Sequence, residues 1–404
     1  MYKRQEVGYG WGTLKNPKEA IKEAIDHAKI NFKDGVEYVI LFSTVDYNLT
    51  KIIKELKNEF PNAQIYGGTS MLAVITRDGY HTSKNGSLAL LIVSSEKVKF
   101  GVGGADIEKY GAREAGKEAI KEAIKNANKK KEIPQVILMT AAPGKEEEII
   151  EGIEEIIGKN VPIIGGSSGD NDLSGKWKQV ANERVYSNGV SLTAVYTDLD
   201  IGIAYEAGYL RSESKGKITN ATGRVIYEIN NMPAAEVYNR WTNGIINQKL
   251  EEGGTILSET TFFPLAKILY GNTTIHYLSI HPLSVNLPEK SLTVFANVKK
   301  DDDILLMHGN WELLLNRAQS TPRKALISKN IPKEKIAFGI YTFCAGTMLA
   351  IPEKERPKMP LLIKSVLGDV PFIGTFTFGE QGFLTEIGNR HGNLANSMVV
   401  FSNE

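Results

Sequence analysis

The sequence repeats one structural pattern, and this repetition limits the possible folds more than any other feature. In the clearest copy, an apolar strand at Val136–Thr140 precedes a helix whose isoleucines recur at helical spacing. A short buried strand at Val161–Ile164 then runs into Gly165–Asp170, with the sequence Gly-Gly-Ser-Ser-Gly-Asp. The copy closes with a turn at Asn188–Gly189 and a strand at Ser191–Tyr196.

The same order of elements occurs twice more. The earlier and later copies consist of strand Tyr38–Phe42, helix 49–60, strand Ile65–Tyr66 and loop Gly67–Ser70, and of strand Ile336–Phe343, helix Leu361–Leu367, strand Val370–Ile373 and loop Gly374–Glu380. Strands at Ile275–Ile280 and Ser291–Ala296 suggest a fourth copy over Leu265–Val298. Recurrence of one unit predicts an architecture built by duplication.

Each unit combines strand, helix and strand with antiparallel strands, which predicts a mixed sheet with helices on one face. Two such units bury their bare faces when they pack sheet against sheet, in helix–sheet–sheet–helix layers. Two pairs of units account for two domains, over residues 1–207 and 224–404. The segment Gly208–Gly223 is rich in Ser, Lys and Gly and is predicted to be the linker. The predicted fold class is α+β, with two domains of duplicated units.

Composition supports two domains and excludes several classes of function. A chain of 404 residues exceeds the usual size of one core, and 42% hydrophobic with 24% charged residues is typical of a globular protein. Apolar runs fall short of a membrane span, and the N-terminus has no signal-peptide pattern. A single cysteine fits a reducing, cytoplasmic location, and a net charge of +1 argues against nucleic acid as a partner.

The glycine-rich segment after the buried strand is the first candidate for a binding site. Its backbone amides and hydroxyls could line a cleft, and the candidate ligand-binding residues are Gly166, Ser167, Ser168, Gly169 and Asp170. The alternative is a bulge that merely turns the chain. A phosphate loop is excluded, since no Gly-Lys-Ser/Thr follows.

The equivalent segment of the last copy supplies Thr377, Gly379 and Glu380. Asp170 and Glu380 occupy matched positions after their glycines, so two carboxylates could bind a ligand amine or take part in acid–base chemistry. Their alternative role is turn capping.

Cys344 follows a strand, where a nucleophile could be presented to a substrate. A free cysteine is more often a small buried hydrophobic residue, which favours a structural role. The six histidines lack the paired spacing of zinc sites, so no metal site is predicted. Any one of them could still serve as the axial ligand of a haem.

At these residues the chain resembles the FIST family. The resemblance rests on Gly67–Ser70 and Gly165–Asp170 in the N-terminal half, and on Asn231–Tyr238, His281–Leu283, Cys344, Phe376–Glu380 and Arg390–Asn393 in the C-terminal half. It implies a sensory module for small ligands, proposed to include amino acids; some similar proteins bind haem and respond to nitric oxide. Where the family often has an arginine soon after Cys-Gly, this chain has Thr347 after Cys344-Ala345-Gly346.

The function predicted from the sequence is reversible binding of a small polar metabolite, such as an amino acid, in a signalling protein that is not an enzyme. No cofactor is required by this interpretation, and a separate signalling protein is an expected partner. Cys344 is placed near the ligand site by the resemblance. Three alternatives stay open: a haem-based nitric oxide sensor, a docking scaffold without ligand, and a hydrolase or transferase that depends on Cys344.

Overall fold

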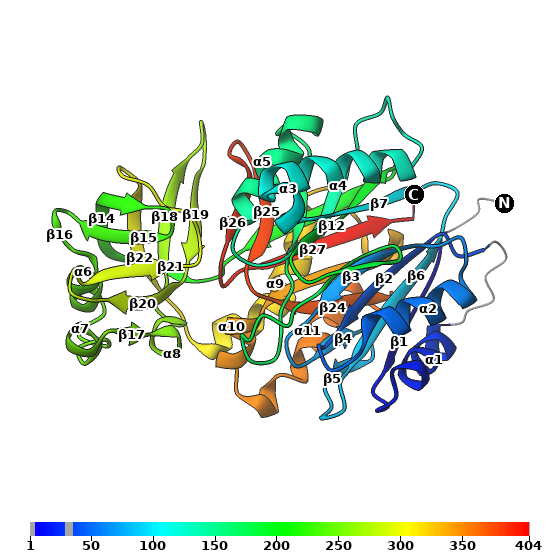
Figure 1. Cartoon of the computed structure of the whole chain (residues 1–404), viewed down its shortest axis with the longest axis horizontal. Coiled ribbons are helices and arrows are strands. Elements are labelled where there is room, and N and C mark those ends of the chain that lie inside the picture. Colours follow the sequence, from blue (N-terminus) through cyan, green and yellow to red (C-terminus); the bar gives the residue numbers. More distant parts are fainter. Residues whose placement is uncertain (1–4, 29–34, 404) are drawn as a thin grey trace.

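The computed structural model describes residues 5–28 and 35–403, and its core consists of three six-stranded sheets built on one plan (Figure 1). The first sheet has the order β1 (Glu6–Gly12), β6 (Leu88–Ser94), β2 (Tyr38–Ser43), β3 (Gln64–Thr69), β10 (Gln179–Ala181) and β11 (Arg184–Tyr186). The second has β26 (Gly388–Gly392), β25 (Glu380–Leu384), β9 (Ile163–Ser167), β8 (Val136–Ala141), β12 (Gly189–Tyr196) and β7 (Lys99–Asp106). The third has β13 (Ile201–Glu206), β27 (Asn396–Ser402), β23 (Ile336–Cys344), β24 (Phe372–Thr377), β4 (Val74–Thr76) and β5 (Gly79–His81).

Each sheet has a parallel pair at its centre, β2–β3, β8–β9 or β23–β24, with antiparallel neighbours. Helices cover the outer faces: α1 (Pro17–Ala28) and α2 (Leu49–Glu59) on the first sheet, α4 (Ala112–Asn126) and α5 (Glu146–Ile157) on the second, α9 (Trp311–Ile327) and α11 (Lys358–Leu367) on the third. The inner faces of all three sheets meet in one central apolar cluster. The predicted α+β class, with helices outside and sheets facing one another, is confirmed.

Side-chain alternation explains why the central strands are apolar throughout. In β2, Ile40 and Phe42 face the central cluster, while Val39 and Leu41 pack under the helices. Both faces are covered, so the strand is a continuous apolar run without the polar alternation of a half-exposed strand. This is the pattern that made the strands recognisable in the sequence.

The first strand of each unit lies directly against a helix. A Cβ atom at Gly10 of β1 would lie 1.9 Å from the carbonyl oxygen of Ala24, and one at Gly103 of β7 would lie 2.1 Å from that of Ala119. Glycine is therefore required at these contacts, because any side chain would collide with helix backbone.

The three units exchange hairpins in a cycle. The β4–β5 hairpin of the first unit pairs with β24 of the third sheet, β10–β11 of the second pairs with β3 of the first, and β25–β26 of the third pairs with β9 of the second. Each sheet is thus completed by another unit, which ties the three into one body.

A nine-stranded sheet is inserted between β13 and α9 of the third unit and forms the separate lobe on the left of Figure 1. We call it the inserted sheet. Its strands are β14 (Leu210–Thr222), β15 (Val225–Ile229), β16 (Met232–Pro233), β17 (Gly254–Thr255), β18 (Leu265–Tyr270), β19 (Ile275–Ile280), β20 (Pro282–Asn286), β21 (Ser291–Val294) and β22 (Asp303–His308). The remaining helices are α3 (Ile107–Tyr110), α6 (Ala234–Trp241), α7 (Lys249–Glu252), α8 (Leu257–Thr260) and α10 (Ala345–Ala350), with 3-10 turns at Lys333–Lys335 and Glu353–Glu355.

Two sequence-based predictions need correction. The predicted linker Gly208–Gly223 is mostly the long strand β14, which pairs with both β15 and β22. Its Ser, Lys and Gly residues reflect an exposed strand, and backbone pairing on both sides orders it. The predicted fourth copy, Leu265–Val298, forms strands of the inserted sheet and lacks the strand–helix–strand order, so three units are present.

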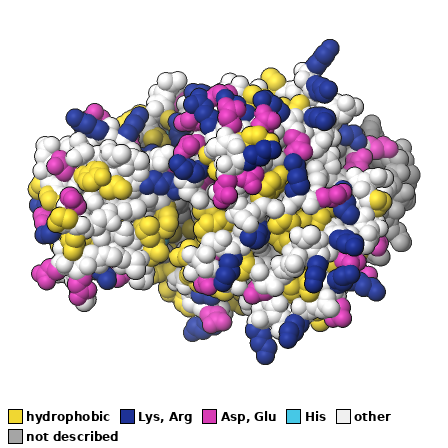
Figure 2. All heavy atoms as spheres, in the orientation of Figure 1, with side chains coloured by type: hydrophobic (Ala, Val, Ile, Leu, Met, Phe, Trp, Pro, Cys, Tyr) yellow, Lys and Arg dark blue, Asp and Glu magenta, His cyan; other side chains and the backbone are white. Residues whose placement is uncertain are grey.

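The surface in Figure 2 carries interspersed positive and negative side chains, and it is hollowed between the inserted sheet and the core, where hydrophobic side chains are visible. Among the residues that the structure describes, no helix combines the length and the apolar character that a membrane crossing requires.

Candidate functional site

Three loops meet where the central parallel strands end, and they are joined in a ring of backbone hydrogen bonds. Met71 N donates to the Phe376 carbonyl over 3.1 Å, Gly169 N to Thr69 over 2.9 Å, and Phe378 N to Ser167 over 2.9 Å. Carboxyl ends of parallel strands are a common place for ligand sites, since loops from several units converge there. The sequence-predicted segments after β9 and β24 therefore lie side by side.

The residues at the end of β9 and in the loop that follows it mostly form hydrogen bonds to other segments of the protein. Ser167 N donates to the Gly379 carbonyl over 2.8 Å, and Ser168 Oγ donates to the Lys178 carbonyl over 2.9 Å. A Cβ atom at Gly166 would lie 2.6 Å from Thr377 Cγ2, so this glycine allows close packing of the two units. The structure places Gly166, Ser167, Thr377 and Gly379 close together, largely through contacts within the protein.

Asp170 is different, because half of its carboxylate is without a partner. The side chain is fully buried, and its Oδ2 accepts a 2.8 Å hydrogen bond from Lys176 N. Its Oδ1 has no hydrogen-bond partner among the described residues. Trp177, the residue after Lys176, is partly exposed and packs edge-on against Phe378 at 6.2 Å between ring centroids. A buried acceptor and the partly exposed Trp177 therefore occur on the same loop, next to Phe378 of the loop between β24 and β25.

Glu380 is fully buried at the start of β25, and both of its oxygens are occupied. Oε1 accepts from Thr377 Oγ1 over 2.8 Å, and Oε2 accepts from Ala395 N over 3.0 Å. Burial raises the pKa of Glu380 to about 8, against the opposing effects of these hydrogen bonds and of Arg317. The expectation that Asp170 and Glu380 together bind one amine therefore needs correction, since Glu380 is committed to internal partners.

Cys344, at the end of β23, is 5% exposed and lies close to Glu380. Burial, and then the charge of Glu380, raises the pKa of the thiol well above its usual range. Reactive cysteines have lowered pKa values and accessible sulfur atoms. This environment is that of an unreactive thiol.

A second buried polar network lies on the other side of the β25–β26 hairpin. Glu146, at the first position of α5, accepts a 2.8 Å hydrogen bond from Ser167 Oγ and a 2.7 Å one from Arg224 of the inserted sheet. Gln381 Nε2 lies 3.3 Å from Ser167 Oγ and 3.2 Å from His391 Nδ1. Burial alone raises the pKa of Glu146, but His391 and Arg224 outweigh it and hold this pKa below its usual range. The carboxylate is therefore ionised at neutral pH.

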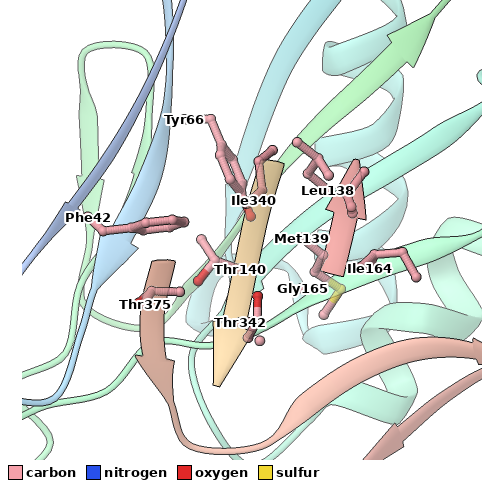
Figure 3. A pocket seen from close by; sticks show the side chains of 12 residues that line it. Phe42, Tyr66, Leu138, Met139, Thr140, Ile164, Gly165, Ile340, Thr342 and Thr375 are labelled. Atoms are coloured by element: carbon pink, nitrogen blue, oxygen red, sulfur yellow. The ribbon is translucent and has the colours of Figure 1, made fainter. Parts of the chain in front are cut away.

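The central cluster contains a small cavity between the three sheets, lined by Phe42, Tyr66 and the threonines Thr140, Thr342 and Thr375 among others (Figure 3). It is just large enough for one water molecule, so a metabolite does not fit. The candidate site is at the strand ends and not in this core.

Sequence reasoning missed Glu146, Arg224, Gln381 and Arg317 as parts of these clusters. For Arg317 a signal existed, since it lies on the apolar stripe of α9 between Leu314, Ala318 and Thr321, where a charged residue must find buried partners. For Arg224 no local signal exists, because it follows a turn glycine and its partners are 77 and 78 residues away.

Comparisons with known proteins cover most of the chain. The profile of the FIST N domain matches residues 37–232, and that of the FIST C domain matches residues 234–383. An uncharacterized protein of Methanocaldococcus jannaschii is 26% identical over 195 residues, which is 46% of this chain and 34% of the relative. The matched stretch is thus about a third of that relative's length.

Two solved structures of cyanuric acid hydrolases were also found. One, from A. caulinodans, has a TM-score of 0.40 at 7% identity and covers 99% of this chain and all of its own. The other, described as an evolutionary innovation by structural concatenation, has a TM-score of 0.34 at 8% identity over the full length of both chains. Likeness at this level assigns no shared activity.

Proposed function

Because the chain belongs to the FIST family, whose domains are associated with signal transduction and ligand sensing, we propose that it senses a small metabolite that carries an amino group. The binding group is the carboxylate of Asp170. The protein acts in this proposal by binding and not by catalysis, and no cofactor takes part.

The observation that carries the proposal is the Oδ1 of the fully buried Asp170, which has no hydrogen-bond partner within residues 5–28 and 35–403. Burying a carboxylate without full pairing costs several kcal/mol, and native proteins rarely retain such a group without a purpose. An ammonium group supplies both the charge and the hydrogen bonds that this oxygen accepts.

The surrounding loop supports a small ligand with a polar end. Backbone groups of this loop already bond to the neighbouring units, so the loop is held in place before any ligand arrives. Trp177 and Phe378 offer partly exposed aromatic surface, which suits the apolar part of a metabolite or a direct cation–π contact.

A thermal-shift screen with amines, amino acids and their deaminated analogues tests the proposal, since a ligand held only by the folded state raises the melting temperature. Asp170→Asn keeps an acceptor for Lys176 N and removes the charge. We expect this variant to fold normally and to lose the shift caused by amines. The matched control is Asp172→Asn, an exposed carboxylate two residues along the same loop.

Amines that stabilise Asp170→Asn as strongly as the wild type would overturn the assignment to Asp170. Stabilisation by haem together with a Soret band would favour the haem-sensor alternative. A complete lack of stabilisation by amines would remove the proposal and favour a docking scaffold.

A further inference from the structure

A continuous chain of side-chain contacts runs from Ser167, the last residue of β9, to the inserted sheet. We call the segment that follows Ser167, residues 168–178, the Asp170 loop. Ser167 stands three residues before Asp170 and donates its hydroxyl proton to Glu146 Oε1 over 2.8 Å. The other oxygen of Glu146 accepts from Arg224 Nη2 over 2.7 Å. Arg224 lies between β14 and β15, so this ion pair crosses from the core to the inserted sheet.

The geometry of Arg224 goes beyond what is needed to fasten the two parts together. The same Nη2 lies 2.7 Å from Oε2 of Glu147, a residue with a 21% exposed side chain. Oε1 of Glu147 also accepts a hydrogen bond from Asn297 N of the inserted sheet. Glu147 alone could anchor the inserted sheet at little cost in desolvation. Glu146, at 1% exposure, carries the desolvation penalty of a buried ion.

What Glu146 adds is a connection to the loop. Glu146 contacts Ser167, Arg224 and, at 3.7 Å, His391. A shift of any of these side chains therefore changes the surroundings of a buried carboxylate. Gln381 contacts both Ser167 and His391 and so limits the positions that the network can adopt. Buried polar networks respond as a unit, because a half-satisfied network is strongly disfavoured.

We propose that the Arg224–Glu146 pair couples the Asp170 loop to the inserted sheet, so that ligand binding at the loop changes how firmly the sheet is held against the core. This inference rests on the proposed function for the identity of the signal, but the coupling itself is a property of the ligand-free protein. Linkage makes it reciprocal: a change at Arg224 must also alter the loop.

Hydrogen exchange of the ligand-free protein tests the coupling. The amides of Ser167, Ser168 and Gly169 all donate to backbone carbonyls of neighbouring segments, so their exchange reports on loop opening. In Arg224→Gln we expect these amides to exchange at least about fivefold faster, the lower end of ordinary coupling between sites. The control is Lys290→Gln, which removes a cation of the inserted sheet that pairs with Glu236 away from the core.

Two further variants separate coupling from simple anchoring. Glu147→Gln removes one ion pair of Arg224 and leaves the contacts of Ser167 unchanged. Glu146→Gln instead changes the residue that connects Ser167 to Arg224. We expect faster exchange at Ser167–Gly169 in Glu146→Gln and little change there in Glu147→Gln. If Arg224→Gln unfolds, the comparison of Glu146→Gln with Glu147→Gln decides between coupling and anchoring.

Faster exchange confined to the inserted sheet, with the Ser167–Gly169 amides unchanged in both Arg224→Gln and Glu146→Gln, would overturn the coupling. This outcome is distinct from failure of the proposed function, which is the lack of any amine effect on the wild type. If an amine does bind, its affinity for Arg224→Gln should differ from that for the wild type by about fivefold or more, with Asp170 intact.

Discussion

One peptide group, between Leu394 and Ala395, links the buried side chains of Arg317 and Glu380. Arg317 Nη1 donates to the Leu394 carbonyl over 2.6 Å, and the Ala395 amide donates to Glu380 Oε2 over 3.0 Å. Leu394 is fully buried and has a φ of 55°, a backbone conformation that residues other than glycine rarely adopt. Arg317 and Glu380 thus hold a strained turn next to Cys344, whose amide donates to the Ala395 carbonyl.

Loss of Arg317 should destabilise the protein strongly. Its guanidinium also donates to the Ala207 carbonyl over 2.5 Å, at the point where the chain leaves the core for the inserted sheet. Arg317→Met leaves buried carbonyls unpaired, so we expect a loss of about 3 kcal/mol in the free energy of unfolding. Urea denaturation measures this, with the exposed Arg323→Met on the same helix as control. A loss no larger than that of the control would contradict this role.

Glu380 should make stability fall as the pH rises. Its pKa is raised from 4.5 in the unfolded chain to about 8 in the folded protein, so the folded state binds more protons between these values. The stabilising contribution is complete below pH 4.5 and is lost as the pH rises through 8, with a slope of up to about 1.4 kcal/mol per pH unit.

The Glu380→Gln variant should lack this slope, whatever its absolute stability. Urea denaturation of both proteins at several values between pH 5 and pH 8 gives the comparison, with the exposed Glu312→Gln as control. Parallel stability curves for Glu380→Gln and the wild type would show that Glu380 is ionised in the folded protein.

Cys344 should resist alkylation while the protein is folded. The chain has one cysteine, so labelling is read directly from the mass of the intact protein. We expect little labelling by iodoacetamide in native buffer and complete labelling in guanidinium chloride, because burial keeps the thiol protonated and covered. Rapid stoichiometric labelling of the folded protein would revive the alternative of a Cys344-dependent hydrolase or transferase.

Close packing of the first strand on α1 should make Gly10 intolerant of substitution. The Cβ atom of Gly10→Ala would collide with the Ala24 carbonyl, which is helix backbone and has little freedom to move. We expect a loss of about 1–3 kcal/mol by urea denaturation, the usual cost of overpacking. Gly35→Ala is the control, since a Cβ atom there has no neighbour within 4 Å among the described residues. Equal stability of the two variants would mean that β1 and α1 can separate at little cost.

The sequence was sufficient to predict the repeated unit and most of its elements. Helix α5 was predicted from the helical spacing of its isoleucines, and strands β2, β8 and β23 were predicted from their continuous apolar runs. Both patterns reflect which side chains are buried, and both are visible in a short stretch of sequence. The loops at Gly165–Asp170 and Gly374–Glu380 were recognised because they recur, and the ring of backbone hydrogen bonds does bring them together.

The tertiary structure alone decided how the units combine. Each exchanged hairpin has the same local pattern whichever sheet it joins, so composition could not reveal that β25–β26 completes the sheet of another unit. The same holds for β14, where pairing on both sides overrides a composition typical of linkers.

The chemistry of the site follows the same division. The sequence named Asp170, Glu380 and Cys344. Only packing determined that Glu380 has both oxygens occupied, whereas one oxygen of Asp170 has no partner in the described part of the chain. The Ser167–Gln381 and Arg317–Leu394 contacts join residues 214 and 77 positions apart. Local periodicity encodes which residues are buried, whereas the partner of each buried polar group depends on long-range packing that no short stretch of sequence contains.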